Sequence, residues 1–219
     1  MTAVADVPLL EINGLTWDTH GTARRLSPDP LTLDPGQSAV VVAGDAAEAD
    51  AFTDLLLGLE APVDGRISID GRQIIMWGPA EREIGLVPAD AGLLPHLTVE
   101  RNLALAATRD DLAPSFARGR ITFMARRMNI QGFLRSRPHE LAHDERLNVA
   151  LARALCRLQP VKVMVIEDRT GCGPCHAAVS GALGADPGLG VLVVTDDRTR
   201  VASLASPAHF WEIADVPES

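Results

Sequence analysis

The chain has 219 residues, of which 47% are hydrophobic and 22% are charged, and its formal net charge is −9. This length and composition are typical of one globular domain with a full hydrophobic core. The negative charge disfavours nucleic acid as a partner, because neutralising phosphates needs a basic surface, and it also disfavours direct adsorption to anionic lipid.

The sequence favours a cytoplasmic location. No apolar run reaches the ~18 residues that a transmembrane helix needs, so we expect no direct membrane insertion. The first residues lack the basic and apolar regions of a secretory signal. Three cysteines, two of them close together, do not form a disulfide framework, which agrees with a reducing compartment.

The first third of the chain is typical of short strands separated by turns. Turns are expected at Asn13-Gly14 and at 34–37, where glycine accompanies asparagine or proline. Alternating or continuous apolar residues between such turns indicate strands. We predict strands at 9–12, 31–33, 38–43, within 63–71, and at 84–88.

The middle of the chain changes to a helical period. Apolar residues recur at helical spacing in 99–113, 115–129 and 143–158. Two continuous apolar runs follow, at 161–166 and 191–195, with a helix-sized segment at 175–183 between them. Continuous runs of this kind fit parallel strands that are buried on both faces. The pattern predicts an α/β core with a helical insertion between about 91 and 157.

The segment 38–59 has the frame of a phosphate-binding loop but not its chemistry. A buried apolar strand runs into Gly44, and a helical pattern resumes near Phe52. The loop motif would read G-x-x-x-x-G-K-[ST], with backbone amides and a lysine around the phosphates. The turn here is acidic, and the single lysine of the chain is Lys162.

Four segments carry a family resemblance: 82–87, 93–103, 138–141 and 149–155. They resemble the ATPase subunits of ABC transporters, in particular those of importers, and the order of motifs matches from about residue 9 to 213. The resemblance implies a P-loop NTPase-like (RecA-like) core with N-terminal antiparallel β strands and an inserted helical subdomain. It implies one domain over 1–219, divided into a core of 1–90 plus 158–219 and a helical subdomain of 91–157.

The family's phosphate loop falls on acidic residues in this chain. The resemblance places its remnant at Gly44, Asp45, Asp50 and Ala51, with Glu48 inside the turn. Carboxylates close to a triphosphate repel it, so we predict only weak binding of ATP and Mg²⁺. The alternative interpretation is an ordinary, solvated acidic helix start that is stabilised by the helix dipole.

The resemblance also locates the loop that carries a glutamine and the signature motif. The glutamine position, which helps to hold Mg²⁺, falls at Ala89. The signature motif, usually L-S-G-G-Q, aligns with Leu141, Ala142, His143, Asp144 and Glu145. Both glycines that let the backbone approach the γ-phosphate are missing. The alternative is again an ordinary helix N-terminus with acids in its first turn.

The catalytic carboxylates are the least altered part. The family's Asp-Glu pair appears in swapped order as Glu167-Asp168, and its switch histidine falls at Asp196. An ionised aspartate cannot donate a hydrogen bond at that position. The chain has no tyrosine to stack on adenine. Trp17 is a candidate for that role, and a core or surface aromatic is the alternative.

The segment Cys172-Gly173-Pro174-Cys175-His176 suggests other chemistry. It resembles a thioredoxin redox motif and a c-type haem attachment site. A metal site could use Cys172, Cys175 and His176 with a distant His209 or Cys156. The chain after His176 is too short for the rest of a thioredoxin fold, and no export signal supports haem. A segment without chemistry is the remaining alternative.

The sequence thus predicts a degenerate ABC-type ATP-binding subunit that does not hydrolyse ATP. It would act as a structural or regulatory partner of a transmembrane permease, of a second ABC ATPase domain, or of its own copy in a homodimer. It would lie peripherally at the inner face of the membrane, held there by the permease. The alternatives are a slow ATPase that uses Glu167 and Asp168, and a thiol-redox or metal module at Cys172 and Cys175.

Overall fold

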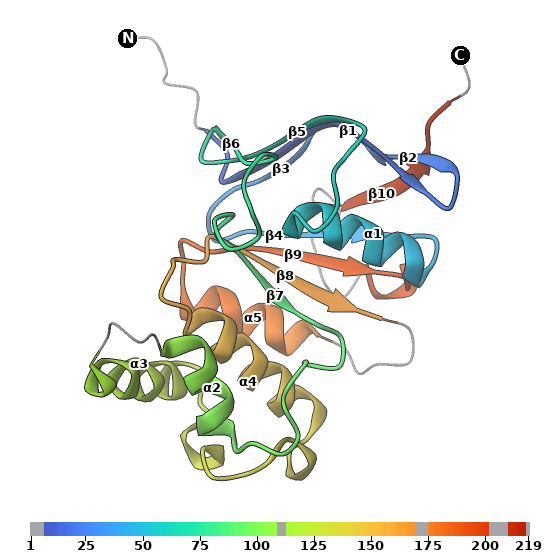
Figure 1. Ribbon diagram of the computed structural model, residues 1–219. Helices are drawn as coiled ribbons and strands as arrows, with labels where there is room; N and C mark the ends of the chain where they lie inside the picture. Colours follow the sequence, from blue (N-terminus) through green and yellow to red (C-terminus); the bar gives the residue numbers. More distant parts are fainter. Residues whose placement is uncertain (1–6, 109–112, 170–174, 202–209, 218–219) are drawn as a thin grey trace.

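The computed structural model describes residues 7–108, 113–169, 175–201 and 210–217. Its described strands form one sheet (Figure 1). One half is parallel and has the order β10-β4-β9-β8-β7. These strands are β10 (Phe210–Asp215), β4 (Ser38–Val42), β9 (Gly190–Thr195), β8 (Val163–Asp168) and β7 (Ile84–Val87).

The other half of the sheet is antiparallel and continues from β10 in the order β2-β1-β5-β6. The short strand β3 pairs with β1. These strands are β2 (Thr22–Ser27), β1 (Leu10–Thr19), β5 (Asp64–Ile69), β6 (Arg72–Gln73) and β3 (Leu31–Leu33). Because β10 pairs with β2 on one side and with β4 on the other, it joins the two halves.

Helices cover both faces of the parallel strands (Figure 1). On one face lies α1 (Ala46–Leu57), and on the other lie α4 (His143–Leu155) and α5 (His176–Ala185). Beyond α4 lie α2 (Val99–Ala107) and α3 (Pro114–Arg127), which with α4 form a helical layer inserted between β7 and β8. Short 3-10 helices lie at Gln131–Phe133, Pro138–Glu140 and Arg198–Arg200.

The apolar runs are buried on both faces, as the sequence predicts. Along β8, Val163 and Val165 belong to the core shared with α1, whereas Met164 and Ile166 belong to the core shared with α2 to α5. Each strand therefore needs apolar residues at consecutive positions. The α/β class, the N-terminal antiparallel strands and the inserted helices are confirmed. The boundaries of the predicted subdomains stay a prediction.

Several local predictions were wrong. The expected turn at Asn13-Gly14 does not end the strand, because Gly14 has a φ of 61° and its pairing with β5 shifts register between Asn13 and Thr16. The helix expected from Phe52 already begins at Ala46. The predictions overlooked β2 and β10, whose residues do not follow a simple apolar alternation.

Candidate functional site

The turn between β4 and α1 begins a regular, well-capped helix. Asp45 is the N-cap residue, and its Oδ1 accepts a hydrogen bond from the backbone N–H of Glu48 at 2.9 Å. This contact satisfies one of the amides that a helix start leaves without a partner. Asp45 and Asp50 are exposed, which agrees with the predicted acidic helix start. The local sequence therefore forms a stable helix N-terminus.

Glu48 departs from that prediction because its carboxylate turns inward. The residue is only 7% exposed, and its Oε2 accepts the backbone N–H of Gly44 at 2.8 Å. A Cβ added at Gly44 would lie 3.0 Å from the same oxygen. The carboxylate therefore fills the inner side of the turn and uses an amide that an anion bound there would need.

Arg24 holds the carboxylate of Glu48 in place. Its Nη2 lies 2.6 Å from Glu48 Oε1, and the two side chains are 22% and 9% exposed. Arg24 lies on β2 and also forms an ion pair with Asp215, its register partner on β10. The closed turn thus depends on the antiparallel pairing of two strands that are far apart in the sequence.

A second ion pair network joins β8 to α1. The Arg169 guanidinium lies between two carboxylates, with its Nη2 at 3.1 Å from Glu167 Oε1 and at 2.8 Å from Asp50 Oδ1. Its Nη1 also donates to the carbonyl of Val194 on β9 at 3.0 Å. The backbone N–H of Ala89 donates to Glu167 Oε2 at 3.4 Å. Three predicted positions, Asp50, Ala89 and Glu167, therefore lie together around an internal cation.

The surroundings of Glu167 disfavour its ionised form. Burial raises the pKa of this carboxyl above its usual range, while Arg169 and the Ala89 amide act in the opposite direction. The carboxylates of Asp50 and Asp54 raise the pKa further. The Arg169 guanidinium partly offsets these effects, because a positive charge in contact with a carboxyl favours its ionised form. Glu167 therefore already has a cationic partner within the protein.

The neighbouring Asp168 pairs with a different arginine. It is 1% exposed, and its Oδ1 forms an ion pair with Arg200, which also contacts Asp197 Oδ2 at 3.1 Å. Burial raises the pKa of Asp168 above its usual range, and the contacts with Arg200 act in the opposite direction. Asp168 Oδ2 has no hydrogen-bond partner among the described residues. Asp196 is half-buried immediately after β9.

The predicted signature residues lie in the helical layer, at the start of α4. Ala142 is the N-cap residue, and its backbone N–H donates to Glu145 Oε2 at 2.8 Å. The carbonyl of Leu141 accepts a hydrogen bond from Arg146 Nη1 at 3.1 Å. His143 and Asp144 occupy the first turn. As at Gly44, a carboxylate of the chain itself binds an amide at a helix start.

The cysteine segment has surroundings that disfavour thiolate chemistry. Cys172 lies outside the described residues, whereas Cys175 is 1% exposed at the start of α5 and His176 is exposed. Burial, together with the charge of Asp168, raises the pKa of Cys175 to about 12, and burial raises that of Cys156 to about 11. Reactive thiols have the opposite shift. Within the described ranges, no three His, Cys, Asp or Glu residues are grouped to hold a metal ion.

Trp17 belongs largely to the core. Its ring is 2% exposed and packs against Phe52 of α1, with the ring centroids 5.6 Å apart. A stacking platform for a base needs an open ring face. The core interpretation of Trp17 therefore fits better than the stacking one. Trp17 also lines a pocket beside α1.

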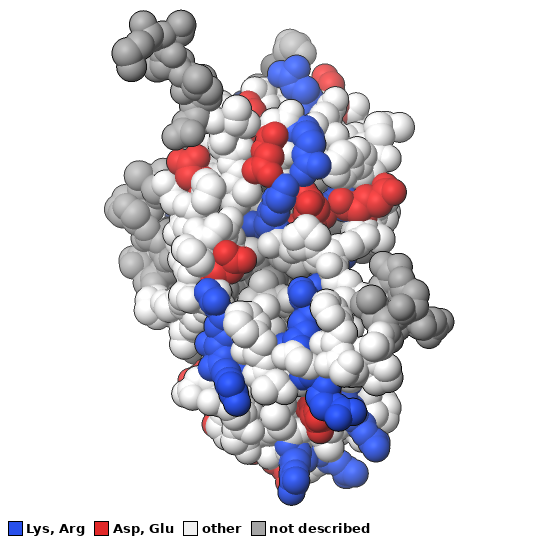
Figure 2. Space-filling model, turned by 90° about the vertical axis from the view of Figure 1, so that its left-hand side faces the viewer, with Lys and Arg blue, Asp and Glu red and all other residues white. Residues whose placement is uncertain are grey.

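The surface charge is unevenly distributed. Residues 91–157 contain 11 of the 20 basic side chains but only 6 of the 29 acidic ones. Figure 2 shows basic residues gathered over the helical layer, in the lower part of that face. On α3 the exposed arginines include Arg118, Arg126 and Arg127. The helical layer is thus basic on an otherwise acidic molecule.

The arginines of these three groups of ion pairs were overlooked in the sequence. Arg169 directly follows the predicted pair Glu167-Asp168, so a cation next to these carboxylates could have been expected from the sequence. Arg24 and Arg200 gave no such signal, because each meets its carboxylate only after the sheet has formed.

Comparisons with known proteins identify related chains. A family model described as ABC transporter matches residues 51–165. The thiamine import ATP-binding protein ThiQ of Brucella suis is 30% identical over 199 residues, which cover 89% of this chain and 80% of that protein. The putrescine transport ATP-binding protein PotG of Escherichia coli is 30% identical over 170 residues, which cover 78% of this chain.

The chain spans only part of some relatives: 44% of PotG and 66% of the Escherichia coli ThiQ. A solved structure of cbiO1 from Clostridium perfringens, part of the ABC transporter complex cbiONQ, has a TM-score of 0.71 at 21% identity. The match covers 87% of this chain and 79% of that one, and it shows a common fold. None of the helices in the described ranges has the length and apolar character needed to span a bilayer.

Proposed function

The chain belongs to the ABC transporter family, and from this premise we propose that it is an ATP-binding-type subunit that no longer hydrolyses ATP. Its role is to act as a structural or regulatory partner of a permease or of a second ATPase domain. Its relatives are named as ATP-binding proteins of thiamine and putrescine transport, which supports the importer class. Neither solute is assigned to this chain.

The observation that carries the proposal is the position of Glu48. A phosphate-binding loop works by positive potential, which comes from backbone amides, a helix N-terminus and a lysine. Here the Gly44 amide and the Arg24 guanidinium both bind the Glu48 carboxylate. A bound phosphate would have to displace this carboxylate and then remain close to it. The cost of that exchange opposes nucleotide binding.

The arginine networks support the same conclusion for the metal ion. A Mg²⁺ ion bound with a nucleotide needs carboxylates that are free to ligate it. Arg169 already contacts Glu167 and Asp50, and Arg200 already contacts Asp168. A divalent ion would place its charge next to these guanidinium groups. The slow ATPase that uses Glu167 and Asp168 is therefore the weaker alternative.

The helical layer is the surface that we assign to the permease. Two apolar side chains of this region, Leu94 and Leu105, are 38% and 55% exposed. A pocket of about 410 Å³ is lined by Leu86 of β7, by residues of α2, by Arg153 of α4 and by Arg157, which follows α4. The basic charge of the layer is complementary to an anionic membrane surface or an acidic partner segment. A permease at the inner face of the membrane would meet both features.

The test has an activity arm and a partner arm. With ATP and Mg²⁺ present, phosphate release by the protein should not exceed that of the buffer alone. Turnover above this background that is abolished by Glu167→Gln would contradict the proposal. In the second arm, the tagged chain is added to detergent-solubilised membranes of its source cell. Recovery of a permease-type membrane protein that is weakened by Leu105→Glu is the expected result.

The matched control for the partner arm is Met76→Glu, because Met76 is 92% exposed and lies outside the helical layer. Capture that is reduced equally by both variants, or no permease at all, would contradict the assigned surface.

A further inference from the structure

A long stretch of the helical layer has no acidic residue. Residues 113–139 contain six arginines and neither aspartate nor glutamate, although the net charge of the whole chain is −9. Five of these arginines are exposed and have no carboxylate partner within the described ranges, namely Arg118, Arg126, Arg127, Arg135 and Arg137. Exposed charges are screened beyond about 8 Å at physiological ionic strength, so an approaching surface responds to the face that it meets. The net charge of the chain therefore does not decide what this face binds.

The helix α3 has a buried face and an unpartnered one. Its buried residues, Ala117, Ile121 and Ala125, recur every four positions and belong to the core of the helical layer. The phenylalanines Phe116 and Phe123 lie outside that core and are 51% and 55% exposed. Residues seven apart lie on the same side of a helix, so both rings are presented to solvent together.

Arginines flank these two rings. The guanidinium of Arg127 lies 5.7 Å from the centroid of the Phe123 ring. A hollow of about 380 Å³ runs along the same helix, and it is lined by Ser115, Arg118, Gly119, Thr122, Phe123 and Arg126. A Cβ added at Gly119 would have no heavy atom within 4 Å, so the middle of this face is open. The hollow combines an aromatic ring with guanidinium groups, which bind phosphate oxygens well.

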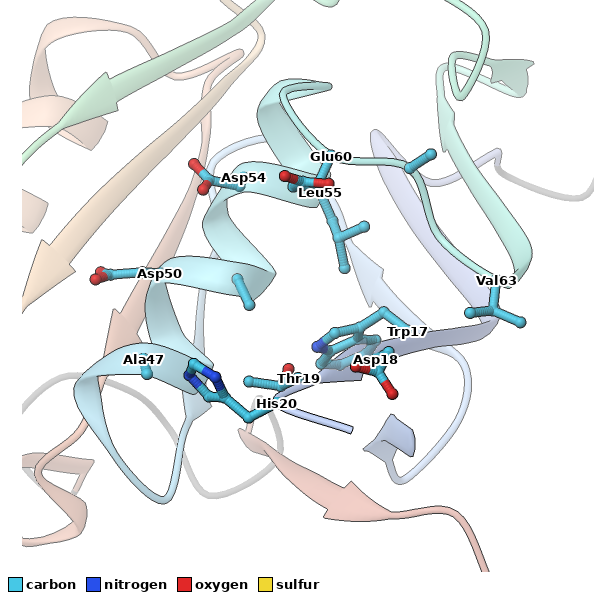
Figure 3. Close-up of a pocket in the computed structure, with 12 residues that line it drawn as sticks. Trp17, Asp18, Thr19, His20, Ala47, Asp50, Asp54, Leu55, Glu60 and Val63 are labelled. Atoms are coloured by element: carbon cyan, nitrogen blue, oxygen red, sulfur yellow. The ribbon is translucent and has the colours of Figure 1, made fainter. Parts of the chain in front are cut away.

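The acidic surface of the molecule lies elsewhere. The pocket beside α1 is lined by four carboxylates, those of Asp18, Asp50, Asp54 and Glu60 (Figure 3). The helices α1 and α3 lie on opposite sides of the sheet, and α3 is at the outer edge of the helical layer (Figure 1). An anionic surface would repel the first side and attract the second. The charge distribution therefore orients the molecule with α3 toward such a surface.

The combination of arginines and exposed rings favours a membrane as the partner. Aromatic side chains beside arginines on a helix surface are typical of helices that lie in the headgroup region of a bilayer. A bilayer with anionic lipids offers phosphate oxygens and, directly behind them, an apolar layer for the rings. An acidic protein segment would match only the charge.

We propose that the exposed face of α3 binds directly to the surface of a membrane that contains anionic phospholipids. The rings of Phe116 and Phe123 enter the boundary between the headgroups and the acyl chains. The guanidinium groups of Arg118, Arg126 and Arg127 contact lipid phosphates. This contact is additional to the permease surface assigned above, and it requires neither a permease nor a nucleotide.

The experiment sediments the purified chain with lipid vesicles in the absence of any membrane protein or nucleotide. One set of vesicles contains phosphatidylcholine alone, and the other contains phosphatidylglycerol as well. We expect binding to the anionic set alone, and this binding should weaken as the salt concentration is raised. No binding, or equal binding to both sets, would overturn the proposal. Neither result bears on the proposed transporter role, because no permease is present.

A pair of variants tests the charge of the face. Arg126→Gln should weaken binding to the anionic vesicles roughly fivefold, which is the contribution of one basic side chain near such a surface. The matched control Arg66→Gln removes the same charge from an exposed position on β5, outside the helical layer. It should bind nearly like the parent protein. Equal losses in the two variants would show that net charge alone decides, and would overturn the proposal.

A second pair tests the rings. Phe123→Ala should weaken binding several-fold, because an apolar ring no longer enters the bilayer. Met76→Ala is the control, since Met76 is 92% exposed and lies outside the helical layer. Unchanged binding of Phe123→Ala would overturn the assigned insertion. Retention of the chain on immobilised polyglutamate, without binding to vesicles, would assign the face to an acidic protein segment and overturn the proposal.

Discussion

Glu48 Oε1 lies 2.6 Å from Arg24 Nη2, and this contact places a carboxylate of the chain inside the turn that precedes α1. The pair joins a helix of the parallel half of the molecule to a strand of the antiparallel half. It therefore couples the shape of the turn to the packing of the two halves, at the position where the family resemblance predicts a phosphate-binding loop.

Replacing Glu48 should measure the strength of this contact. Glu48→Gln keeps the size of the side chain but leaves the guanidinium of Arg24 without one of its carboxylates. We expect a loss of about 1–3 kcal/mol in the free energy of unfolding, since a charge-assisted hydrogen bond is lost in a largely buried place. Urea denaturation gives this value directly.

The matched control for that variant is Glu60→Gln, because Glu60 is exposed and has no ion pair among the described residues. It should change stability by less than about 0.5 kcal/mol. Equal effects in the two variants would show that the contact of Glu48 with Arg24 contributes nothing specific.

Much of the fold could be predicted from the sequence, because burial on both faces imposes continuous apolar runs on β8 and β9. From the single lysine of the chain, Lys162, we predicted a phosphate loop that lacks its lysine, and this stays a prediction. The position of Glu48 could not be predicted, because Arg24 is supplied by β2, where Leu26 is the single fully buried residue. Such a strand has no alternating pattern, and its pairing with β10 is known only once both strands are in the sheet.

A pH-dependent prediction concerns Asp54, whose pKa is raised by burial and by neighbouring carboxylates. A raised pKa means that the folded protein favours the protonated form. Asp54 therefore destabilises the fold at neutral pH, and this effect disappears as the pH falls through the folded pKa toward the unfolded value. Asp54→Asn should stabilise the protein at neutral pH by up to about 0.5 kcal/mol.

The gain should vanish near the pKa of unfolded aspartate, about 3.9. Thermal unfolding of the parent and the variant across this pH range checks the sign, with the exposed Asp34→Asn as control. A gain that grows as the pH falls would contradict the assigned cause.

Arg82 should be important for stability. It is 2% exposed, and its guanidinium donates to the carbonyl oxygens of Leu55 and Leu56, at 2.6 and 3.0 Å, and to those of Ile75 and Trp77. Burial lowers its pKa. A lysine cannot reach four carbonyls in this planar arrangement.

Arg82→Lys should therefore cost about 2–4 kcal/mol in unfolding free energy, because buried acceptors lose their donors. Arg66→Lys, on an exposed part of β5, is the matched control and should be nearly neutral. Calorimetry of the two variants gives the comparison, and a neutral Arg82→Lys would show that water replaces the lost donors.

The thiol of Cys175 should be unreactive in the folded protein. Its pKa of about 12 leaves very little thiolate at neutral pH, and the residue is 1% exposed. Alkylation by iodoacetamide should be roughly 100-fold or more slower than for a free cysteine, and unfolding should restore it. Peptide mass spectrometry resolves this residue from the other cysteines. Rapid labelling in the native state would revive the thiol-redox alternative.

The most direct measurement is a thermal-shift titration with ATP in the presence and absence of Mg²⁺. A ligand at 100 times its dissociation constant stabilises a protein by about 2.7 kcal/mol, which such a titration detects easily. If the Glu48 carboxylate closes the loop, the melting temperature should not change up to several millimolar nucleotide. A saturable, Mg²⁺-dependent increase would contradict that account and would mean that the loop opens to bind phosphate.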